Sequence, residues 1–209
     1  MGVILAGRAS AADSLLLADP AAPLAAAWTH RRFVGATDYA PTVMDGVPAI
    51  RAIGRHSASG LYRPVGYRVA AHPWLTWRWR VDKLQPSADI RVREREDFAA
   101  AVFLIFGDPS RFDPGAPTLA YVWTSDRVPT GAVVRNPHRP DSLRDIVLRS
   151  GPAQLGQWVQ ERCNLAADFR AAFGRDPPDT VGILALFTDN DQTGEPVEAY
   201  YGTITAEAE

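Results

Sequence analysis

Residues 74–81 read Trp-Leu-Thr-Trp-Arg-Trp-Arg-Val, and this alternation decides the fold class. In an extended strand, neighbouring side chains point to opposite faces. The apolar face of this strand carries Leu75, Trp77, Trp79 and Val81, and the polar face carries Thr76, Arg78 and Arg80. A face with two tryptophans has to be packed, whereas a face with two arginines needs water, carboxylates or a ligand. The stretch therefore predicts one strand of a large β-sheet whose second face is polar.

Short β-rich runs continue on both sides of this stretch, separated by turn signals such as Asp45-Gly46 and Asn136-Pro137. Ten strands are predicted, over residues 29–34, 49–55, 60–67, 74–81, 98–106, 119–124, 146–150, 158–165, 181–188 and 199–206. The run 99–106 is apolar throughout, which favours a central strand buried on both faces. One helix is predicted over 166–173, ending at Gly174, and a shorter helical turn near 14–17.

These elements predict an all-β fold, a jelly-roll type antiparallel β-sandwich with one short helix. The alternation of strands and helices that is typical of parallel sheets is missing. A length of 209 residues suits one large sandwich. We expect residues 1–27, which are rich in alanine, to form a weakly ordered lead-in, and residues 28–209 to form a single domain.

Composition excludes several classes of partner. A net charge of −2 argues against a nucleic-acid binder, which needs a basic patch. No run approaches the roughly 20 apolar residues of a membrane helix, and the N-terminus lacks the pattern of a signal peptide. The single cysteine, Cys163, can form neither an intramolecular disulfide nor a cysteine metal cluster. The oligomeric state is not indicated.

The charged run Arg91–Asp97 precedes the most apolar strand. If this strand is a neighbour of the strand predicted over residues 74–81, Glu96 or Asp97 is expected to pair with Arg78 or Arg80 across the polar face. The alternative is a solvated edge that discourages pairing with another sheet. Carboxylates lying roughly 5–10 Å apart in a cleft can also hydrolyse glycosides. The candidates for such a pair are Glu94, Glu96, Asp97, Asp126 and Glu161.

Residues 188–195 read Thr-Asp-Asn-Asp-Gln-Thr-Gly-Glu and lie between two predicted strands. Asp189, Asp191 and Thr193 alternate before a glycine, as oxygen ligands do in the first half of a calcium loop. An EF-hand is excluded, because its twelfth position would be Tyr200 and no helices flank the loop. The alternative is a plain hairpin loop in which Asp and Asn side chains bond their own backbone.

Aromatic residues provide the remaining signal. In residues 119–123, Leu-Ala-Tyr-Val-Trp, the alternation places Tyr121 and Trp123 on one face of a strand. Sandwiches that bind sugars expose such rings beneath pyranose rings, with Arg, Asp and Asn supplying hydrogen bonds. The alternative is that these rings belong to the core, where most tryptophans of strands lie.

Several segments together resemble the bacterial family of uncharacterised proteins called DUF3047. The matching segments are 57–63 (Ser-Ala-Ser-Gly-Leu-Tyr-Arg), 77–81, 96–100, 121–123, 136–137, 188–194 and 199–202. This family has no established activity, and the resemblance implies an exported protein, periplasmic or secreted. A looser resemblance, from Gly156-Gln157-Trp158 to Asp168-Phe169, is to galactose-binding-like jelly rolls, the fold of many carbohydrate-binding modules.

These observations lead to the hypothesis that the sandwich binds a glycan or another polyhydroxylated ligand on a polar and aromatic sheet face. The ligand-binding candidates are Arg78, Arg80, Glu96, Asp97, Trp123 and Asn136, and the candidate ligands of a structural calcium ion are Asp189, Asp191 and Thr193. Two alternatives stay open. One is a glycan-acting hydrolase or lyase that uses carboxylates of the same face, and the other is a non-catalytic structural or partner-binding envelope protein.

Overall fold

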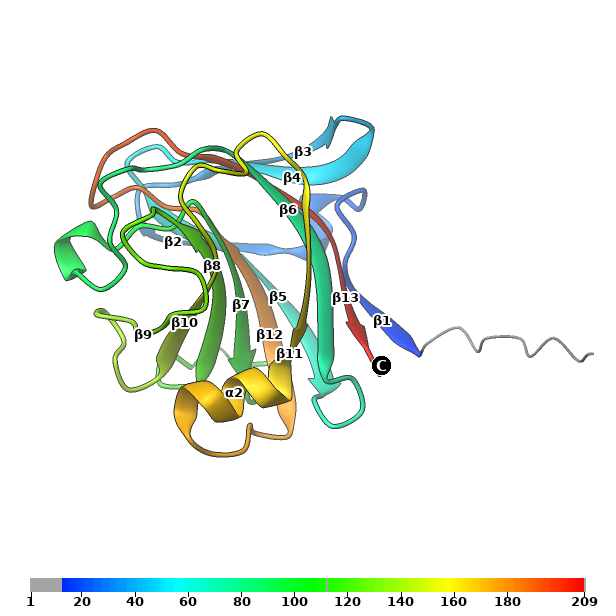
Figure 1. Ribbon diagram of the computed structural model, residues 1–209. Helices are drawn as coiled ribbons and strands as arrows, with labels where there is room; N and C mark the ends of the chain where they lie inside the picture. The colour runs from blue at the N-terminus through cyan, green and yellow to red at the C-terminus, as the bar shows by residue number, and fades with distance from the viewer. Residues whose placement is uncertain (1–12, 112, 209) are drawn as a thin grey trace, which may run out of the picture.

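The computed structural model describes residues 13–111 and 113–208, which form two β-sheets packed face to face (Figure 1). In sheet A the strand order is β11-β6-β13-β4-β3, and β1 also pairs with β13. The strands of sheet A are β1 (Ser14–Ala18), β3 (Asp38–Met44), β4 (Val47–Ile53), β6 (Trp74–Lys83), β11 (Val159–Asn164) and β13 (Glu198–Glu207). In sheet B the order is β2-β5-β12-β7-β8-β10-β9. The strands of sheet B are β2 (Thr29–Val34), β5 (Ala58–Arg68), β7 (Ala100–Phe106), β8 (Thr118–Thr124), β9 (Val133–Arg135), β10 (Leu143–Ser150) and β12 (Thr180–Phe187).

This arrangement confirms the prediction of a jelly-roll type β-sandwich. All described strand pairs are antiparallel except β8 and β10, which run parallel. The helical elements are α1 (Leu24–Ala27), the 3₁₀ turn Arg93–Arg95 and α2 (Leu165–Phe173). Helix α2 begins at Asn164, whose side chain accepts a hydrogen bond from the Ala167 amide, and it ends at Gly174 in the left-handed conformation. No helix within the described ranges is long and apolar enough to cross a membrane.

The core between the sheets depends on the tryptophans of β6. Trp77 and Trp79 are only 1% and 0% exposed. The Trp77 ring centroid lies 5.3 Å from that of Tyr121, and the Trp79 centroid lies 6.0 Å from that of Trp123. These contacts join β6 of sheet A to β8 of sheet B. The prediction that Trp77 and Trp79 point inward is confirmed.

Sheet B is also covered on its outer face, the face turned away from sheet A. Every residue of β7 is buried, as the apolar run predicted. Alternate residues of β7 belong to two separate hydrophobic clusters: Leu104 lies in the core between the sheets, whereas Phe103 packs on the outer face. Phe98 and Val128, from the segments that precede β7 and follow β8, pack with Phe103 in the outer cluster. A second layer of packed side chains therefore lies over the outer face, where the candidate site is found.

All ten predicted strands are present, with ends that differ by a few residues. Three further strands were missed. Strand β3 contains Pro41, which normally argues against a strand but is tolerated here because β3 is the edge of sheet A. Strand β9 has only three residues, too few to show an alternation. The helical turn predicted near residues 14–17 is wrong: this segment is β1, which pairs with the end of β13, so tertiary pairing overrides its local preference.

Residues 1–12 of the predicted lead-in lie outside the described residues. The rest of the lead-in contributes β1 and α1. The division of the chain at residue 28, with one domain following it, stays a prediction.

Candidate functional site

A cavity of about 350 Å³ lies on the outer face of sheet B. Its apolar floor is formed mainly by Tyr62, Phe103 and Phe187. The Phe103 and Phe187 rings stack with centroids 5.5 Å apart and an interplanar angle of 8°. At the rim, the Phe33 ring is 56% exposed and its centroid lies 6.1 Å from that of Phe187. The remaining lining residues are Val34, Ala58, Glu96, Phe98, Asn136, His138, Arg139, Leu143, Asp189, Asp191 and Gln192.

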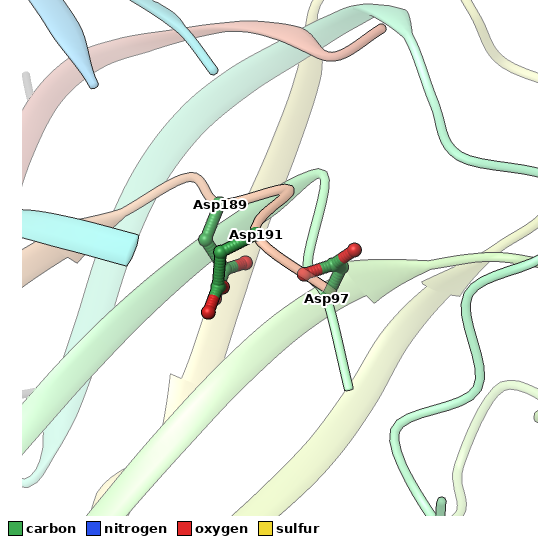
Figure 2. Close-up of side chains that lie close together, drawn as sticks. All are labelled: Asp97, Asp189 and Asp191. Carbon is green, nitrogen blue, oxygen red and sulfur yellow. The ribbon is translucent and has the colours of Figure 1, made fainter. Parts of the chain in front are cut away.

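Three aspartates converge at one end of this cavity, and we call Asp97, Asp189 and Asp191 the aspartate triad (Figure 2). Each contributes one carboxylate oxygen, and these oxygens lie within 4.8 Å of one another. The topology explains the convergence. Strands β12 and β7 are antiparallel neighbours, with Phe187 opposite Ala101. The last residues of β12 therefore lie beside the first residues of β7, at the same end of the two strands. Asp97 precedes β7 and the other two aspartates follow β12.

Backbone amides hold the triad in place. Asp97 Oδ2 accepts a hydrogen bond from the Thr193 amide at 2.7 Å, and its Oδ1 accepts one from the Gln192 amide at 3.3 Å. Asp189 Oδ1 accepts one from the Phe98 amide at 2.7 Å. The segments before β7 and after β12 are therefore tied to each other in both directions, by one carboxylate from each.

The triad carries more negative charge than its surroundings neutralise. Burial, with the charges of Glu96 and Asp97, raises the pKa of Asp189 well above its usual value. Burial and the charge of Asp97 also raise the pKa of Asp191. Asp191 Oδ1 is buried and has no hydrogen-bond partner in the described part of the chain. Carboxylate oxygens are among the ligands that a hard cation such as calcium prefers, so the triad has the donor atoms to hold an ion.

A second pair of acids, Glu96 and Asp145, is bridged by one amide group. Asn136 Nδ2 donates hydrogen bonds to Glu96 Oε1 and, at 3.0 Å, to Asp145 Oδ2. Asn136 Oδ1 accepts from the amides of His138 at 3.0 Å and Arg139 at 3.2 Å. The turn between β9 and β10 is thereby fixed against the segment before β7, and all the hydrogen-bonding capacity of the Asn136 side chain is used.

Both bridged acids bind their protons more tightly than usual. Burial and the charge of Asp145 raise the pKa of Glu96 well above its usual value, although the hydrogen bond from Asn136 opposes this. Burial raises the pKa of Asp145 to about 7, and the same amide partly offsets the effect. His138 Nε2 lies 3.5 Å from Glu96 Oε2. A buried acid with a raised pKa inside a cavity is a common property of functional sites.

The sequence-predicted residues fall into two groups. Glu96, Asp97, Asn136, Asp189 and Asp191 come together at this end of the cavity. Thr193 lies in the same loop, and its role as a metal ligand stays a prediction. Its amide donates to Asp97, and its hydroxyl accepts a hydrogen bond from the Glu195 amide at 3.3 Å.

Arg78 and Arg80 lie elsewhere, on the outer face of sheet A. Arg80 pairs with Asp82 at 2.6 Å and Asp45 at 2.5 Å, and the Arg78 guanidinium lies 5.7 Å from the centre of the Trp158 ring. The expected pairing of these arginines with Glu96 or Asp97 is wrong, because β6 and β7 belong to different sheets with the core between them.

Trp123 also lies outside the cavity. Its side chain is 1% exposed in the core, and its Nε1 donates to the Gly151 carbonyl at 3.3 Å. The expectation that it faces a ligand is wrong, since the face of β8 that carries Tyr121 and Trp123 is the inner one.

Asp145 and the aromatic floor were not predicted from the sequence. The alternation along β10 places Asp145 on the same face as Leu143 and Val147, both of the outer cluster. An acid at an apolar position is a signal that points to a functional or buried pair. Within residues 188–195, Asn190 bonds the backbone of its own loop, as the alternative interpretation predicted: its Nδ2 donates a hydrogen bond to the Glu195 carbonyl at 3.0 Å.

Solved structures share this architecture. The family 11 carbohydrate-binding module of the cellulosomal cellulase Lic26A-Cel5E of Clostridium thermocellum superposes with a TM-score of 0.52 and 8% identity, covering 95% of this chain and 96% of that chain. The xyloglucanase domain of NopAA from Sinorhizobium fredii gives a TM-score of 0.49 and 8% identity, over 96% and 100% of the two chains. Endoglucanase cel12A from Rhodothermus marinus gives 0.45 and 12%, over 86% and 95%. The first of these supports a jelly-roll sandwich of the kind found in carbohydrate-binding modules.

The family itself is defined by sequence. The model of the family described as "Protein of unknown function (DUF3047)" matches residues 26–205, so the chain belongs to this family, as the resemblance indicated. No curated protein matches the chain.

The bridged acids generate a prediction about pH. Asp145 has a pKa of about 7 in the folded protein and about 3.9 when unfolded, so the folded state holds more protons between these values. The free energy of unfolding should therefore fall as pH rises through this range, by up to about 1.4 kcal/mol per pH unit for one group. In Asp145→Asn this slope should be shallower, as measured by urea unfolding in EDTA from pH 4.5 to 8.

The control variant is Asp141→Asn, whose side chain is 97% exposed on the same β9–β10 turn. It should keep the slope of the wild type. A slope that is the same in Asp145→Asn and in the wild type would contradict the raised pKa.

Proposed function

We propose that the cavity on the outer face of sheet B binds a glycan. The observation that carries this proposal is the combination, within one cavity, of an aromatic floor and a wall of acceptor groups. Phe103, Phe187 and the exposed Phe33 offer ring surfaces for the apolar C–H faces of a sugar. Glu96 and Asp191 offer oxygens to its hydroxyl groups. A few converging polar groups on an apolar surface are characteristic of small-molecule sites.

The size of the cavity is consistent with part of a glycan. A volume of about 350 Å³ lies at the lower end of the range of small-molecule sites. The exposed Phe33 extends the aromatic surface outward from the floor, toward further sugar units. The fold adds support, since the module from Clostridium thermocellum with the same architecture is a carbohydrate-binding module. The export implied by the family resemblance stays a prediction.

A divalent cation, with calcium as the first choice, is the second part of this proposal. The aspartate triad supplies oxygen ligands, and a cation there would relieve the repulsion that raises the pKa values of Asp189 and Asp191. The residues fit the ion by the chemistry of their donors and by the unpartnered Asp191 Oδ1. The ion would brace the segments before β7 and after β12, which carry the polar end of the cavity.

A second candidate function, glycan hydrolysis, is favoured by one observation. Glu96 is a cavity-lining acid whose pKa is raised by burial, which is the direction that a general acid requires. Asp189 and Asp191 lie in the same cavity, where a carboxylate would serve as base or nucleophile.

Glycan binding is tested with an array followed by calorimetry. We expect the wild type to bind at least one class of glycan. Phe33→Ala should weaken binding about tenfold, because a stacked aromatic ring contributes roughly 1 kcal/mol beyond the area that it covers. The control is Arg78→Ala on sheet A, which should leave the affinity unchanged. No binding on the array, or a loss in Arg78→Ala with none in Phe33→Ala, would contradict the proposed site.

The cation is tested by thermal unfolding in EDTA and in millimolar calcium. Calcium at a hundred times its Kd should stabilise the wild type by about 2.7 kcal/mol, a rise in Tm of several degrees. Asp191→Asn should abolish this rise and should also raise the Tm in EDTA, since it removes a repelled carboxylate. Asp141→Asn serves as the control with an intact triad. Wild-type midpoints that coincide in the two buffers would count against the ion.

Hydrolysis is tested by incubating the protein with the glycan that it binds and measuring new reducing ends. Glu96→Gln should retain binding and lose at least about a hundredfold in rate, as expected for removal of a general acid. Glu94→Gln, at an exposed position two residues away, is the matched control. A wild type that binds glycan without any turnover would leave the protein as a binding module.

A further inference from the structure

Arg139 is a half-buried cation in the cavity without a matching anion. Its Nη2 donates to the Ala116 carbonyl and to Thr118 Oγ1, both at 3.3 Å, and both of these acceptors are neutral. Its Nε is buried and has no partner within the described chain. Among residues 13–111 and 113–208, no carboxylate oxygen lies within 4.0 Å of a guanidinium nitrogen of Arg139, the limit for an ion pair.

Arg149 is an example of a guanidinium whose charge is neutralised by a carboxylate of the protein. Arg149 places Nε 2.7 Å from Glu161 Oε1 and Nη2 2.9 Å from Glu161 Oε2, in the two-pronged geometry that matches a carboxylate. That contact raises the pKa of Arg149, whereas burial lowers the pKa of Arg139. The charge of Arg139 is therefore poorly stabilised by the protein alone, and a buried charge of this kind favours an anionic partner.

The acids of the cavity do not supply this partner. The carboxylates that act on Arg139 in its favour are those of Asp145 and Asp113, and neither of them forms an ion pair with it in the described part of the chain. Asp145 Oδ2 instead accepts a hydrogen bond from Asn136 Nδ2 at 3.0 Å, and Glu96 Oε1 accepts one from the same amide group.

The strand register separates Arg139 from the aspartate triad. Arg139 reaches Thr118, which lies opposite Ile105 on β7. Two members of the triad follow Phe187, which lies opposite Ala101, and the third precedes β7 at the same end. Ala101 and Ile105 are four residues apart, about 13 Å along an antiparallel strand. A ligand that spans the aromatic floor would therefore meet a positive group at one end and an acceptor-rich end at the other.

We propose that the glycan bound in this cavity is acidic, with a uronate carboxylate paired to the Arg139 guanidinium. This inference rests on the proposed glycan binding and adds the class of sugar. The carboxylate fits because the planar guanidinium presents its N–H groups in a fork that matches two carboxylate oxygens. The C–H face of the ring would lie on Phe103 and Phe187, and hydroxyl groups would point toward the triad and Glu96.

The test compares matched ligands by calorimetry. A panel of uronate oligosaccharides is titrated beside the same oligosaccharides as methyl esters, which keep size and stereochemistry and lose the charge. We expect the wild type to bind at least one acidic oligosaccharide about tenfold more tightly than its ester. This preference should weaken as salt rises from 50 to 500 mM, because salt screens the pair.

Two variants assign the preference to one residue. Arg139→Gln should remove it, so that acid and ester bind alike, and Arg139→Lys should keep part of it by retaining the charge. Arg135→Gln, at an exposed guanidinium just before the same turn, should keep it in full. The salt series on the wild type needs no variant and decides the question even where Arg139→Gln fails to fold.

The outcomes separate this inference from the function on which it rests. Binding of neutral glycans or of the esters with equal or higher affinity overturns the acidic ligand and leaves glycan binding intact. Tighter binding of sulfated oligosaccharides than of uronates overturns the assignment to a carboxylate. If neither acidic nor neutral glycans bind, the proposed function falls, and this inference falls with it.

Discussion

The pairing of β7 with β12 in the middle of sheet B is the constraint on which the site depends. Both strands are apolar along nearly their whole length and are buried on two sides, so their register is strongly fixed. With that register fixed, whatever precedes β7 and whatever follows β12 must lie side by side. The chain places acids at both positions, and the backbone amides of each segment bind the carboxylates of the other.

Such a concentration of acids opposes folding unless something compensates it. Burial raises the pKa values of Glu96, Asp145, Asp189 and Asp191, and repulsion by neighbouring carboxylates adds to the rise at all of them except Asp145. Protons and cations are the two available compensations, and they compete for the same oxygens. The core between the sheets does not involve any of these acids.

The sequence predicted the architecture because period-2 alternation is a local property. Residues 74–81 showed two faces, and the structure has Trp77 and Trp79 of the apolar face buried between the sheets. The same pattern did not show which strands are neighbours, and for this reason Arg78 and Arg80 were expected to pair with acids that lie on the other sheet. The alternation along β8 likewise did not show whether the face that carries Trp123 points into the core or toward a ligand. These are questions of tertiary pairing, which a single strand does not encode.

The candidate site was predicted in part for the same reason. Asp189 and Asp191 stood out because they alternate within one loop, and Asp97 because it borders an apolar run. Their convergence follows from the pairing of two distant strands, and no local pattern reports it. Asp145 and Arg139 were missed although Asp145 sits at an apolar position of its strand, a signal that is weak until the outer cover of sheet B is known.

The two described ends of the chain meet on sheet A. The Ala208 amide donates a hydrogen bond to the Asp13 carbonyl at 3.0 Å, and β1 runs antiparallel to β13 beside them (Figure 1). The cavity opens on the outer face of sheet B, in the other layer of the sandwich. Tethering the protein to a solid support through either of these positions therefore leaves the cavity facing away from that support. Their proximity also makes joining them, and reopening the chain in an exposed turn such as Asp45-Gly46, a natural route to circular permutation.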